Sequence, residues 1–311
     1  MTPLVSVLLP VYNRPQWIGR AIESVFAQSY PRVELIVVDD GSTDKTPDVI
    51  ERFGPRVTSL RQPNRGAYAA RNLGLARARG ELIAFIDSDD SWYPDRLSSQ
   101  VPLFDKSEVG LVFGDAAIVD HDGPVPSRRR VTSFETTPPR RGLVSHHFVW
   151  GNFVPMSSVV VRRRCLDEVG GFPDSARLSA DYLTWFRISL RHELDYVPSP
   201  VFEYARHQGS ISRNLVSSLR ARIELFEGLL ATTTDPATLA SLRQLLHNLH
   251  LSMLLARVRR NRGTGLAVPR GGVPALGNAS LLERLHWASG FALNQLRVRL
   301  SRRMTPTARR G

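Results

Sequence analysis

The segment from Gly80 to Leu97 reads GELIAFIDSDDSWYPDRL and changes from apolar to acidic within a few residues. Its apolar run, Leu82–Ile86, is typical of a strand that is buried on both faces. The carboxylates of Asp87, Asp89 and Asp90 follow at the carboxyl end of this strand. Ligands of open α/β sheets bind at that edge, and carboxylates at this density favour Mg²⁺ or Mn²⁺ carrying a phosphate. The alternative is a polar turn after a strand.

The N-terminal part of the chain alternates between strand and helix patterns. Apolar runs predict buried strands at residues 4–11, 34–38 and 57–60. Residues 17–26 have apolar side chains at helical spacing, and residues 66–78, rich in Ala and Arg, predict a further helix. The alternation predicts an α/β fold with a doubly wound, largely parallel sheet and flanking helices.

A second predicted strand also ends in acidic residues. The strand at 34–38 is followed by Asp39 and Asp40, so both acidic groups would lie on the same edge of a parallel sheet. One group could bind a nucleobase or ribose while the other holds a metal-bound diphosphate. The chain contains neither Gly-x-Gly-x-x-Gly after its first strand nor Gly-x-x-x-x-Gly-Lys-Ser/Thr. It therefore lacks the phosphate-cradling backbone of dinucleotide-binding and P-loop proteins.

Two later residues have the chemistry of site residues. Ser179 is placed to cap a helix whose first turn holds Asp181, which is either a good helix start or a general base delivered from a helix N-terminus. His207 follows a strand-like run at residues 197–204. A lone histidine is usually structural or exposed, but one that follows a strand in a chain with a carboxylate metal site is a candidate ligand.

The segment at residues 121–141 is rich in Pro, Arg, Ser and Thr. We expect an exposed, mobile loop here. It contains the run Arg128–Arg130, which is either a solvated surface run or a contact for an anionic acceptor.

Taken in order, these segments resemble glycosyltransferase family 2, an inverting family with the GT-A fold. The resemblance extends from about Pro3 to Ser212 and rests on several short motifs that are specific only together. The motifs are VSVLLPVYN (5–13), VVDDGSTD (37–44), N-x-G followed by ARN (64–72), GExIAFxDSDD (80–90), GGF (170–172), ADYxxWxR (180–187) and Arg-His (206–207).

The family pattern implies a role for each matching residue. The residues implied to bind the nucleotide are Pro10, Tyr12, Asn13, Asp39, Arg71 and Asp87. Asp39 would accept a hydrogen bond from the base, and Asp87 would contact the ribose. The implied ligands of Mg²⁺ or Mn²⁺ are Asp89, Asp90 and His207. The implied catalytic base is Asp181, and the implied acceptor-side aromatic residue is Trp185.

These roles imply inverting transfer of a sugar from a nucleoside diphosphate donor, which we expect to be UDP-linked, to an acceptor hydroxyl. The metal and Arg71 would stabilise the leaving diphosphate while Asp181 takes the proton of the hydroxyl. Many family members build cell-surface polysaccharide, so we expect a glycan or a lipid-linked acceptor. Ala180 stands where the family usually has Glu. The alternative is therefore a nucleotide-sugar-binding scaffold that has lost turnover.

The formal charge of +12 is confined to the C-terminal part of the chain. Residues 1–211 carry 25 basic and 25 acidic side chains, whereas residues 212–311 carry 16 Arg and 4 acidic residues. We therefore expect a catalytic domain at 1–212, with a nucleotide-sugar half at about 1–100 and an acceptor half at about 101–212. A basic helical extension would occupy residues 213–311.

Amphipathic helices are predicted within the extension at residues 239–260 and 281–303. They either pack on protein or attach to an anionic bilayer, where each Arg contributes roughly 1 kcal/mol. A nucleic-acid-binding tail is a third hypothesis, and the lack of aromatic residues interleaved with the Arg residues argues against it. Cys165 is the only cysteine and no signal peptide or spanning helix is evident. We therefore expect a cytoplasmic protein, with attachment to the inner face of the plasma membrane as an option for the extension.

Overall fold

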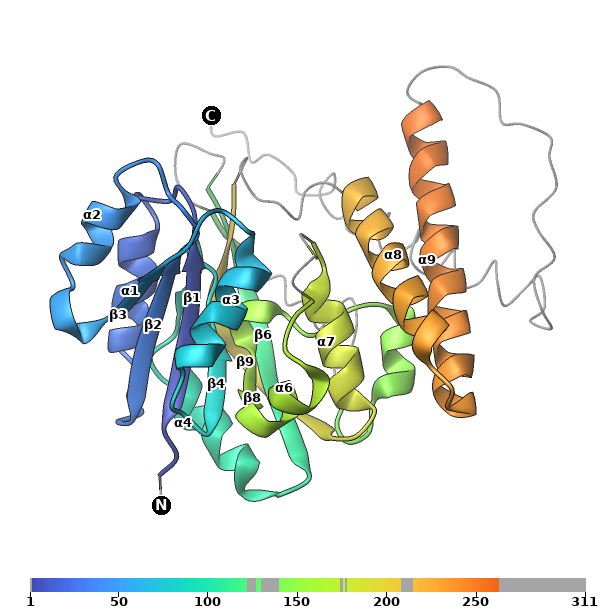
Figure 1. The fold of residues 1–311 in the computed structure, drawn as a ribbon, viewed down its shortest axis with the longest axis horizontal. Coiled ribbons are helices and arrows are strands. Elements are labelled where there is room, and N and C mark those ends of the chain that lie inside the picture. The colour runs from blue at the N-terminus through green and yellow to red at the C-terminus, as the bar shows by residue number, and fades with distance from the viewer. Residues whose placement is uncertain are drawn as a thin grey trace, which may run out of the picture. The chain divides into compact units, whose positions relative to one another are not determined.

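The computed structural model describes residues 2–121, 127–129, 140–173, 176, 178–207 and 215–262. In these parts of the chain, nine strands form one mixed sheet, with helices on both of its faces (Figure 1). The predicted α/β fold with flanking helices is confirmed.

The N-terminal half of the sheet is parallel. Its strands are β1 (Val5–Val11), β2 (Val33–Asp39), β3 (Thr58–Arg61) and β4 (Leu82–Phe85), in the order β3-β2-β1-β4. Val11, the last residue of β1, pairs with Asp39, the last residue of β2. Because these strands are parallel, the residues that follow β2 and β4 lie at the same edge of the sheet, as predicted.

The other half of the sheet is mixed. β8 (Val160–Arg162) runs antiparallel between β4 and β6 (Val109–Asp120), and β9 (Glu193–Arg206) pairs in parallel with β6. β5 (Ser91–Trp92) pairs antiparallel with β9.

The segment at 121–141, predicted to be a loop, contains a strand. Residues Ser127–Arg129 form β7, which pairs antiparallel with the end of β6. The prediction of an uninterrupted loop is therefore wrong for this run, because the end of β6 offers it an edge for pairing. Residues 122–126 and 130–139 lie outside the described residues.

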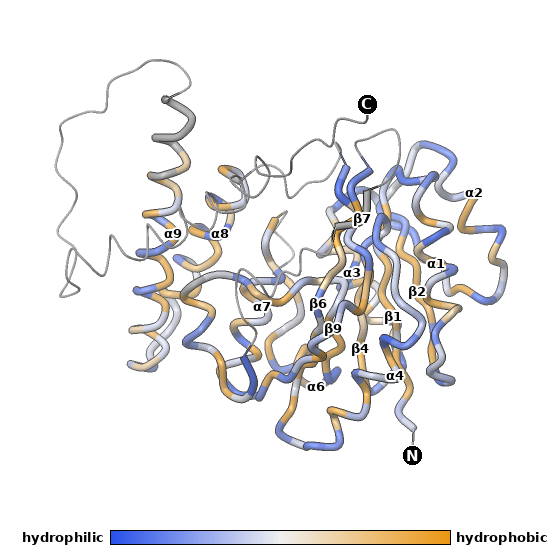
Figure 2. The backbone as a smooth tube through the Cα atoms, turned by 180° about the vertical axis from the view of Figure 1, so that it is seen from behind, coloured by the Kyte–Doolittle hydropathy of each residue, from blue (hydrophilic) through white to orange (hydrophobic). Residues whose placement is uncertain are grey.

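Figure 2 shows hydrophobic stretches along the central strands. These strands are buried on both faces, and their side chains belong to two cores. Along β1, Leu8 points into one core while Val7 and Leu9 point into the other. α1 (Ile18–Phe26), α2 (Thr46–Glu51) and α4 (Arg96–Gln100) cover the Val7 side. α3 (Ala67–Arg77), α6 (Arg163–Val169) and α7 (Ala180–Ser189) cover the Leu8 side. Short 3₁₀ helices, η1 (Gly54–Arg56), η2 (Val101–Asp105), η3 (Ser145–Trp150) and η4 (Met156–Ser158), complete these layers.

Two long helices, α8 (Leu215–Thr232) and α9 (Pro236–Arg262), follow β9 and lie side by side (Figure 1). Their apolar side chains join the core on the Leu8 side, where Phe226 meets Tyr182 and Phe186 of α7. One compact unit therefore runs from Met1 to Arg260. The predicted boundary at residue 212 falls inside this unit, because α8 and α9 supply part of its core.

The helix predicted at residues 239–260 is present as α9. The helix predicted at residues 281–303 lies outside the described residues. Within the described parts of the chain, no helix combines the length and the apolar character needed to cross a membrane.

Candidate active site

The loops after β1 and β2 are joined by hydrogen bonds at the carboxyl edge of the sheet. The Asn13 backbone N–H donates to Ser42 Oγ at 3.0 Å, and Asn13 Oδ1 accepts from the Thr43 N–H at 2.8 Å. Asn13 has a φ of 51°, a conformation that short polar side chains tolerate better than most. Asp39 accepts from the Ser42 N–H at 2.9 Å. Two of the predicted nucleotide residues, Asn13 and Asp39, are thus brought to the same loop junction.

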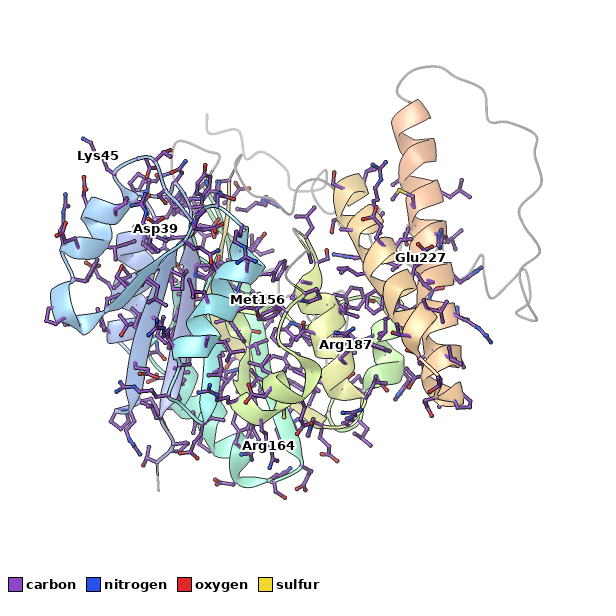
Figure 3. The ribbon with its side chains drawn as sticks, in the orientation of Figure 1. Asp39, Lys45, Met156, Arg164, Arg187 and Glu227 are labelled. Atoms are coloured by element: carbon purple, nitrogen blue, oxygen red, sulfur yellow. The ribbon has the colours of Figure 1, made fainter. Side chains whose placement is uncertain are left out.

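A cavity of about 370 Å³ opens beside Asp39, which Figure 3 labels at the end of β2. The other lining residues come from α2, η1, β3 and their flanks, and are Pro47, Ile50, Glu51, Gly54, Val57, Ser59 and Arg61. Asp39 is only 3% exposed, and Arg61 Nη1 lies 3.4 Å from its Oδ2 atom. Apolar walls with a few polar groups are typical of small-molecule sites.

Pro10 and Tyr12, both predicted to line the nucleotide pocket, differ in exposure. Pro10 lies within β1, is buried, and pairs with Val38. Tyr12 lies just beyond the strand and is 44% exposed. Of the two, Tyr12 therefore offers the open side chain at this edge.

Asp40 is buried and fixes the loop that leads into α3. Its Oδ1 atom accepts from the Arg65 N–H at 2.8 Å and from the Gln62 side chain at 2.7 Å. Its Oδ2 atom accepts from the Gly66 N–H at 2.8 Å. The second acid of the Asp39-Asp40 pair thus places the start of the helix that carries Arg71.

Arg71 forms an ion pair with Asp87, the first acid after β4. The Asp87 N–H donates to Ser157 Oγ at 3.0 Å, which fixes the backbone of the acidic turn. Desolvation raises the pKa of Asp87 above its usual value; Arg71 opposes this shift, and the charges of Asp89 and Asp181 add to it. The charges of these carboxylates therefore add to a negative field that favours a cation.

Asp89 and His207, two of the predicted metal ligands, lie in contact although they are far apart in the sequence. Asp89 Oδ2 is 2.9 Å from His207 Nε2, and the two side chains are 20% and 11% exposed. The ring of Trp17 stacks on His207 with a centroid distance of 5.1 Å, and His121 meets Trp17 in an edge-on arrangement at 4.8 Å. The His207 imidazole therefore packs against Trp17, the residue that immediately precedes α1.

An oxygen and a nitrogen donor this close together fit a divalent cation. In the parts of the chain that the structure describes, no group of three or more His, Cys, Asp or Glu side chains could hold an ion. The carboxylate and imidazole of the Asp89–His207 pair are donors of the kind that such an ion accepts.

Asp90, the third predicted ligand, faces a different environment. It is 2% exposed, and its Oδ1 atom accepts from the Ala205 N–H at 3.0 Å. Desolvation, with the charges of Asp87 and Asp89, raises its pKa well above the usual value. The carboxylate braces the end of β9 just before His207, and its role as a metal ligand stays a prediction.

Asp181, the predicted base, lies at the second residue of α7 and has a hydrogen-bond donor on each carboxylate oxygen. Tyr68 Oη donates to Oδ1 at 2.8 Å, and Asn152 Nδ2 donates to Oδ2 at 2.9 Å. Ser179 occupies the position before α7, with a φ of 59°, but makes no side-chain cap hydrogen bond. The predicted cap is therefore wrong. The Ser179 hydroxyl instead lies 3.1 Å from Ser218 Oγ of α8.

Trp185, predicted to face the acceptor, is fully buried. Its ring packs against Phe85 and Phe172, with centroid distances of 5.8 and 5.7 Å. In this structure it has no exposed surface for an acceptor, because its ring packs into the core between α7 and the sheet. The predicted acceptor contact is not supported.

Sequence reasoning missed the contacts that Tyr68, Asn152 and Trp17 make with predicted site residues. Tyr68 lies three residues before Arg71 on α3, so the two share a helix face, and this spacing could have pointed to it. Asn152 lies in an irregular segment between η3 and η4, and no local pattern distinguishes it. Trp17 reads in the sequence as part of the apolar face of α1.

A known sequence family and several curated relatives match much of this chain. The sequence model described as "Glycosyl transferase family 2" matches residues 6–166. An uncharacterized glycosyltransferase of Nostoc sp. is 35% identical over 174 residues, which cover 53% of this chain and 52% of the relative. The matched segments span 31% and 52% of the length of the first two curated relatives.

Solved structures share the fold across most of the chain. A mannosyltransferase from Pyrobaculum calidifontis, in complex with GDP-Man and Mn²⁺, has a TM-score of 0.63 at 22% identity, covering 94% of this chain and 81% of that one. Residues 1–349 of TarS from S. aureus, in complex with UDP-GlcNAc, give a TM-score of 0.61 at 19% identity, covering 92% and 79%. These similarities confirm the predicted GT-A-type fold.

Proposed function

This chain belongs to glycosyltransferase family 2, and from that premise we propose that it transfers a hexosyl group from a nucleoside diphosphate donor to an acceptor hydroxyl, with inversion at the anomeric carbon. One observation carries the proposal. The fold brings the Arg71–Asp87 pair, the Asp89–His207 pair and the carboxylate of Asp181 to one region from distant parts of the chain.

The donor nucleotide would bind at the ends of β1 and β2. Its base would enter the cavity beside Asp39, where the carboxylate can accept a ring N–H, and the exposed ring of Tyr12 is available for stacking. Arg71 and Asp87 would lie under the ribose and diphosphate. We propose a UDP-linked donor, and both UDP-GlcNAc and GDP-Man are bound by proteins of this fold.

Asp89 and His207 would hold the metal ion, with Mn²⁺ favoured over Mg²⁺ because it accepts an imidazole nitrogen more readily. When bound, the ion supplies positive charge that stabilises the departing diphosphate. Trp17 fixes the plane of the His207 ring, and Asp90 fixes the strand end that carries it. Both would keep the ligand pair in place.

Asp181 would act as the general base. Its carboxylate takes the proton of the acceptor hydroxyl while the hydroxyl oxygen attacks the anomeric carbon and the bond to the diphosphate breaks. A single base without a paired carboxylate nucleophile favours one displacement with inversion. Ala180, where the family usually has Glu, is fully buried, and the Asp181 carboxylate accepts hydrogen bonds from Tyr68 and Asn152.

We further propose that the acceptor is a glycan or a lipid-linked glycan of cell-surface polysaccharide or glycolipid synthesis. The positive charge of residues 212–311 supports this, because it would hold the protein at an anionic membrane surface where such acceptors lie.

The proposal is tested with Asp181→Asn, which keeps the size of the side chain but removes the base. We expect nucleotide release from UDP-sugars with Mn²⁺ to fall by about 10²-fold or more, with water as the acceptor, while the affinity for UDP stays unchanged. Asp105→Asn, an exposed site elsewhere, is the matched control. A wild-type chain that binds nucleotide sugars without releasing nucleotide would instead support the scaffold alternative.

A further inference from the structure

The carboxylate of Asp181 is held from both sides by donors of two different segments. Tyr68 Oη, from α3, lies 2.8 Å from Oδ1, and Asn152 Nδ2, before η4, lies 2.9 Å from Oδ2. One donor on each oxygen fixes the rotation of the carboxylate about its last torsion, which is otherwise soft. One lone pair on each oxygen is left for another hydrogen-bond partner.

Each donor is itself fixed in orientation. Asn152 Oδ1 accepts from the Val154 N–H at 3.1 Å, so its amide nitrogen faces Asp181. The Tyr68 ring packs on Phe172 with a centroid distance of 5.5 Å. Burial, together with the charge of Asp181, raises the pKa of Tyr68 well above its usual value, so the phenol keeps its proton and remains a donor.

Tyr68 also contacts the donor-binding side of the site. The guanidinium of Arg71 lies 5.2 Å from the centroid of the Tyr68 ring, and the same guanidinium pairs with Asp87. Asn72, the next residue of α3, exchanges two hydrogen bonds with the backbone of Phe172. The helix is therefore fastened next to the ring on which Tyr68 packs.

We propose that Tyr68 and Asn152 are positioning residues that fix the base Asp181, and that Tyr68 links its orientation to the Arg71–Asp87 pair on the donor side. This inference rests on the proposed function. This chain has a buried Ala180 where the family usually has Glu, so no carboxylate at position 180 can help to orient Asp181. We assign that role to Tyr68 and Asn152.

The test removes one hydrogen bond and leaves the ring in place. Tyr68→Phe is compared with Tyr30→Phe, a matched change at a tyrosine whose hydroxyl donates to the Pro3 carbonyl at 2.5 Å on the other side of the sheet. The rate of nucleotide release is measured with UDP-glucose, UDP-GlcNAc, GDP-mannose and dTDP-glucose in Mn²⁺, and UDP affinity is measured by calorimetry.

We expect Tyr68→Phe to lower the rate at saturating donor by about tenfold or more, because small displacements of a catalytic group cost that much. UDP affinity should stay within about twofold, and Tyr30→Phe should match the wild type. In an Asp181→Asn background, Tyr68→Phe should not lower the rate further, because Tyr68 acts by orienting the Asp181 carboxylate, which this variant no longer has. Asn152→Ala should behave in the same way.

The outcomes separate the two proposals. A Tyr68→Phe variant as fast as the wild type overturns this inference alone, as does an equal loss of rate in the Asp181→Asn background, which would mark a merely structural role. A wild-type chain that binds none of the nucleotide sugars overturns the proposed function and this inference with it.

Discussion

Asp89 and Asp90 are adjacent carboxylates with different surroundings. Asp89 is part of a partly open pair with His207, whereas Asp90 is 2% exposed and bonded to the backbone of β9. A metal ion exchanges its ligands through an accessible position, so the open carboxylate is the better candidate to bind it. The two side chains are therefore expected to respond differently to substitution.

We expect Asp89→Ala to remove the Mn²⁺ dependence of UDP binding and to weaken that binding by tenfold or more. Asp90→Asn should leave the affinity for UDP in Mn²⁺ within about twofold of the wild type, because Asn Oδ1 can still accept from the Ala205 N–H. Calorimetric titration of UDP with Mn²⁺, and again with EDTA, measures both effects. If Asp90→Asn weakens Mn²⁺-dependent binding as much as Asp89→Ala does, Asp90 is itself a ligand, as the sequence motif predicts.

At the level of single residues, the sequence predicted the acids at the strand ends because those positions follow directly from the strand pattern. It did not predict that Trp185 is buried, because a helix of mixed pattern does not reveal which face meets the sheet. The Tyr68–Asp181 contact joins residues 113 positions apart, so only the tertiary fold reveals it.

Helix α7, which carries the proposed base, packs against α8. Phe226 of α8 is fully buried, with ring centroids 4.9 Å from Tyr182 and 5.7 Å from Phe186. Arg222 of α8 donates to Ser179 Oγ at 3.2 Å, at the residue with positive φ that starts α7. The helix that bears Asp181 is therefore positioned by a segment that the sequence assigns to a separate extension.

Phe226→Ala should lower the free energy of unfolding by about 3 kcal/mol, because it leaves a cavity between α7 and α8. Chemical denaturation, with Phe226→Leu as the volume-conserving control, measures this loss. We also expect slower nucleotide release from the folded variant, since α7 would shift. Unchanged stability in Phe226→Ala would mean that α8 contributes little to the core and that residues 1–212 form a domain alone.

The strands and their ends could be predicted because each is a continuous local pattern, whereas the role of α8 and α9 could not. Arg residues dominate the charge after residue 212, which led to the prediction of a separate basic helical extension. The buried leucines of α9, such as Leu242 and Leu245, read as one side of an amphipathic helix, and that pattern does not say which surface it covers. The partner face belongs to η3 and α7, where Asn248 donates to the Val149 carbonyl at 2.8 Å.

Over the whole molecule, the positively charged part of the chain begins well before the compact unit ends. The compact unit extends to Arg260, but the excess of positive charge begins near residue 212 and continues to the C-terminus. Residues 263–311 carry eight Arg and one acidic residue. A test of membrane attachment must therefore keep α8 and α9 intact and alter only the charge of the last segment.

We expect the full-length protein to float with vesicles that contain phosphatidylglycerol, and not with vesicles of phosphatidylcholine alone. Changing Arg297, Arg299, Arg302 and Arg303 to Gln should weaken this binding strongly, because each Arg near an anionic surface contributes about 1 kcal/mol. The same four positions changed to Lys keep their charge and should retain binding, which separates attraction by charge from a specific Arg contact. Higher salt should weaken the binding of the wild type, since it screens surface charge. If the Gln and Lys variants float equally well, the charge of these four residues does not attach the protein to the membrane. The positive charge of this segment would then need another partner.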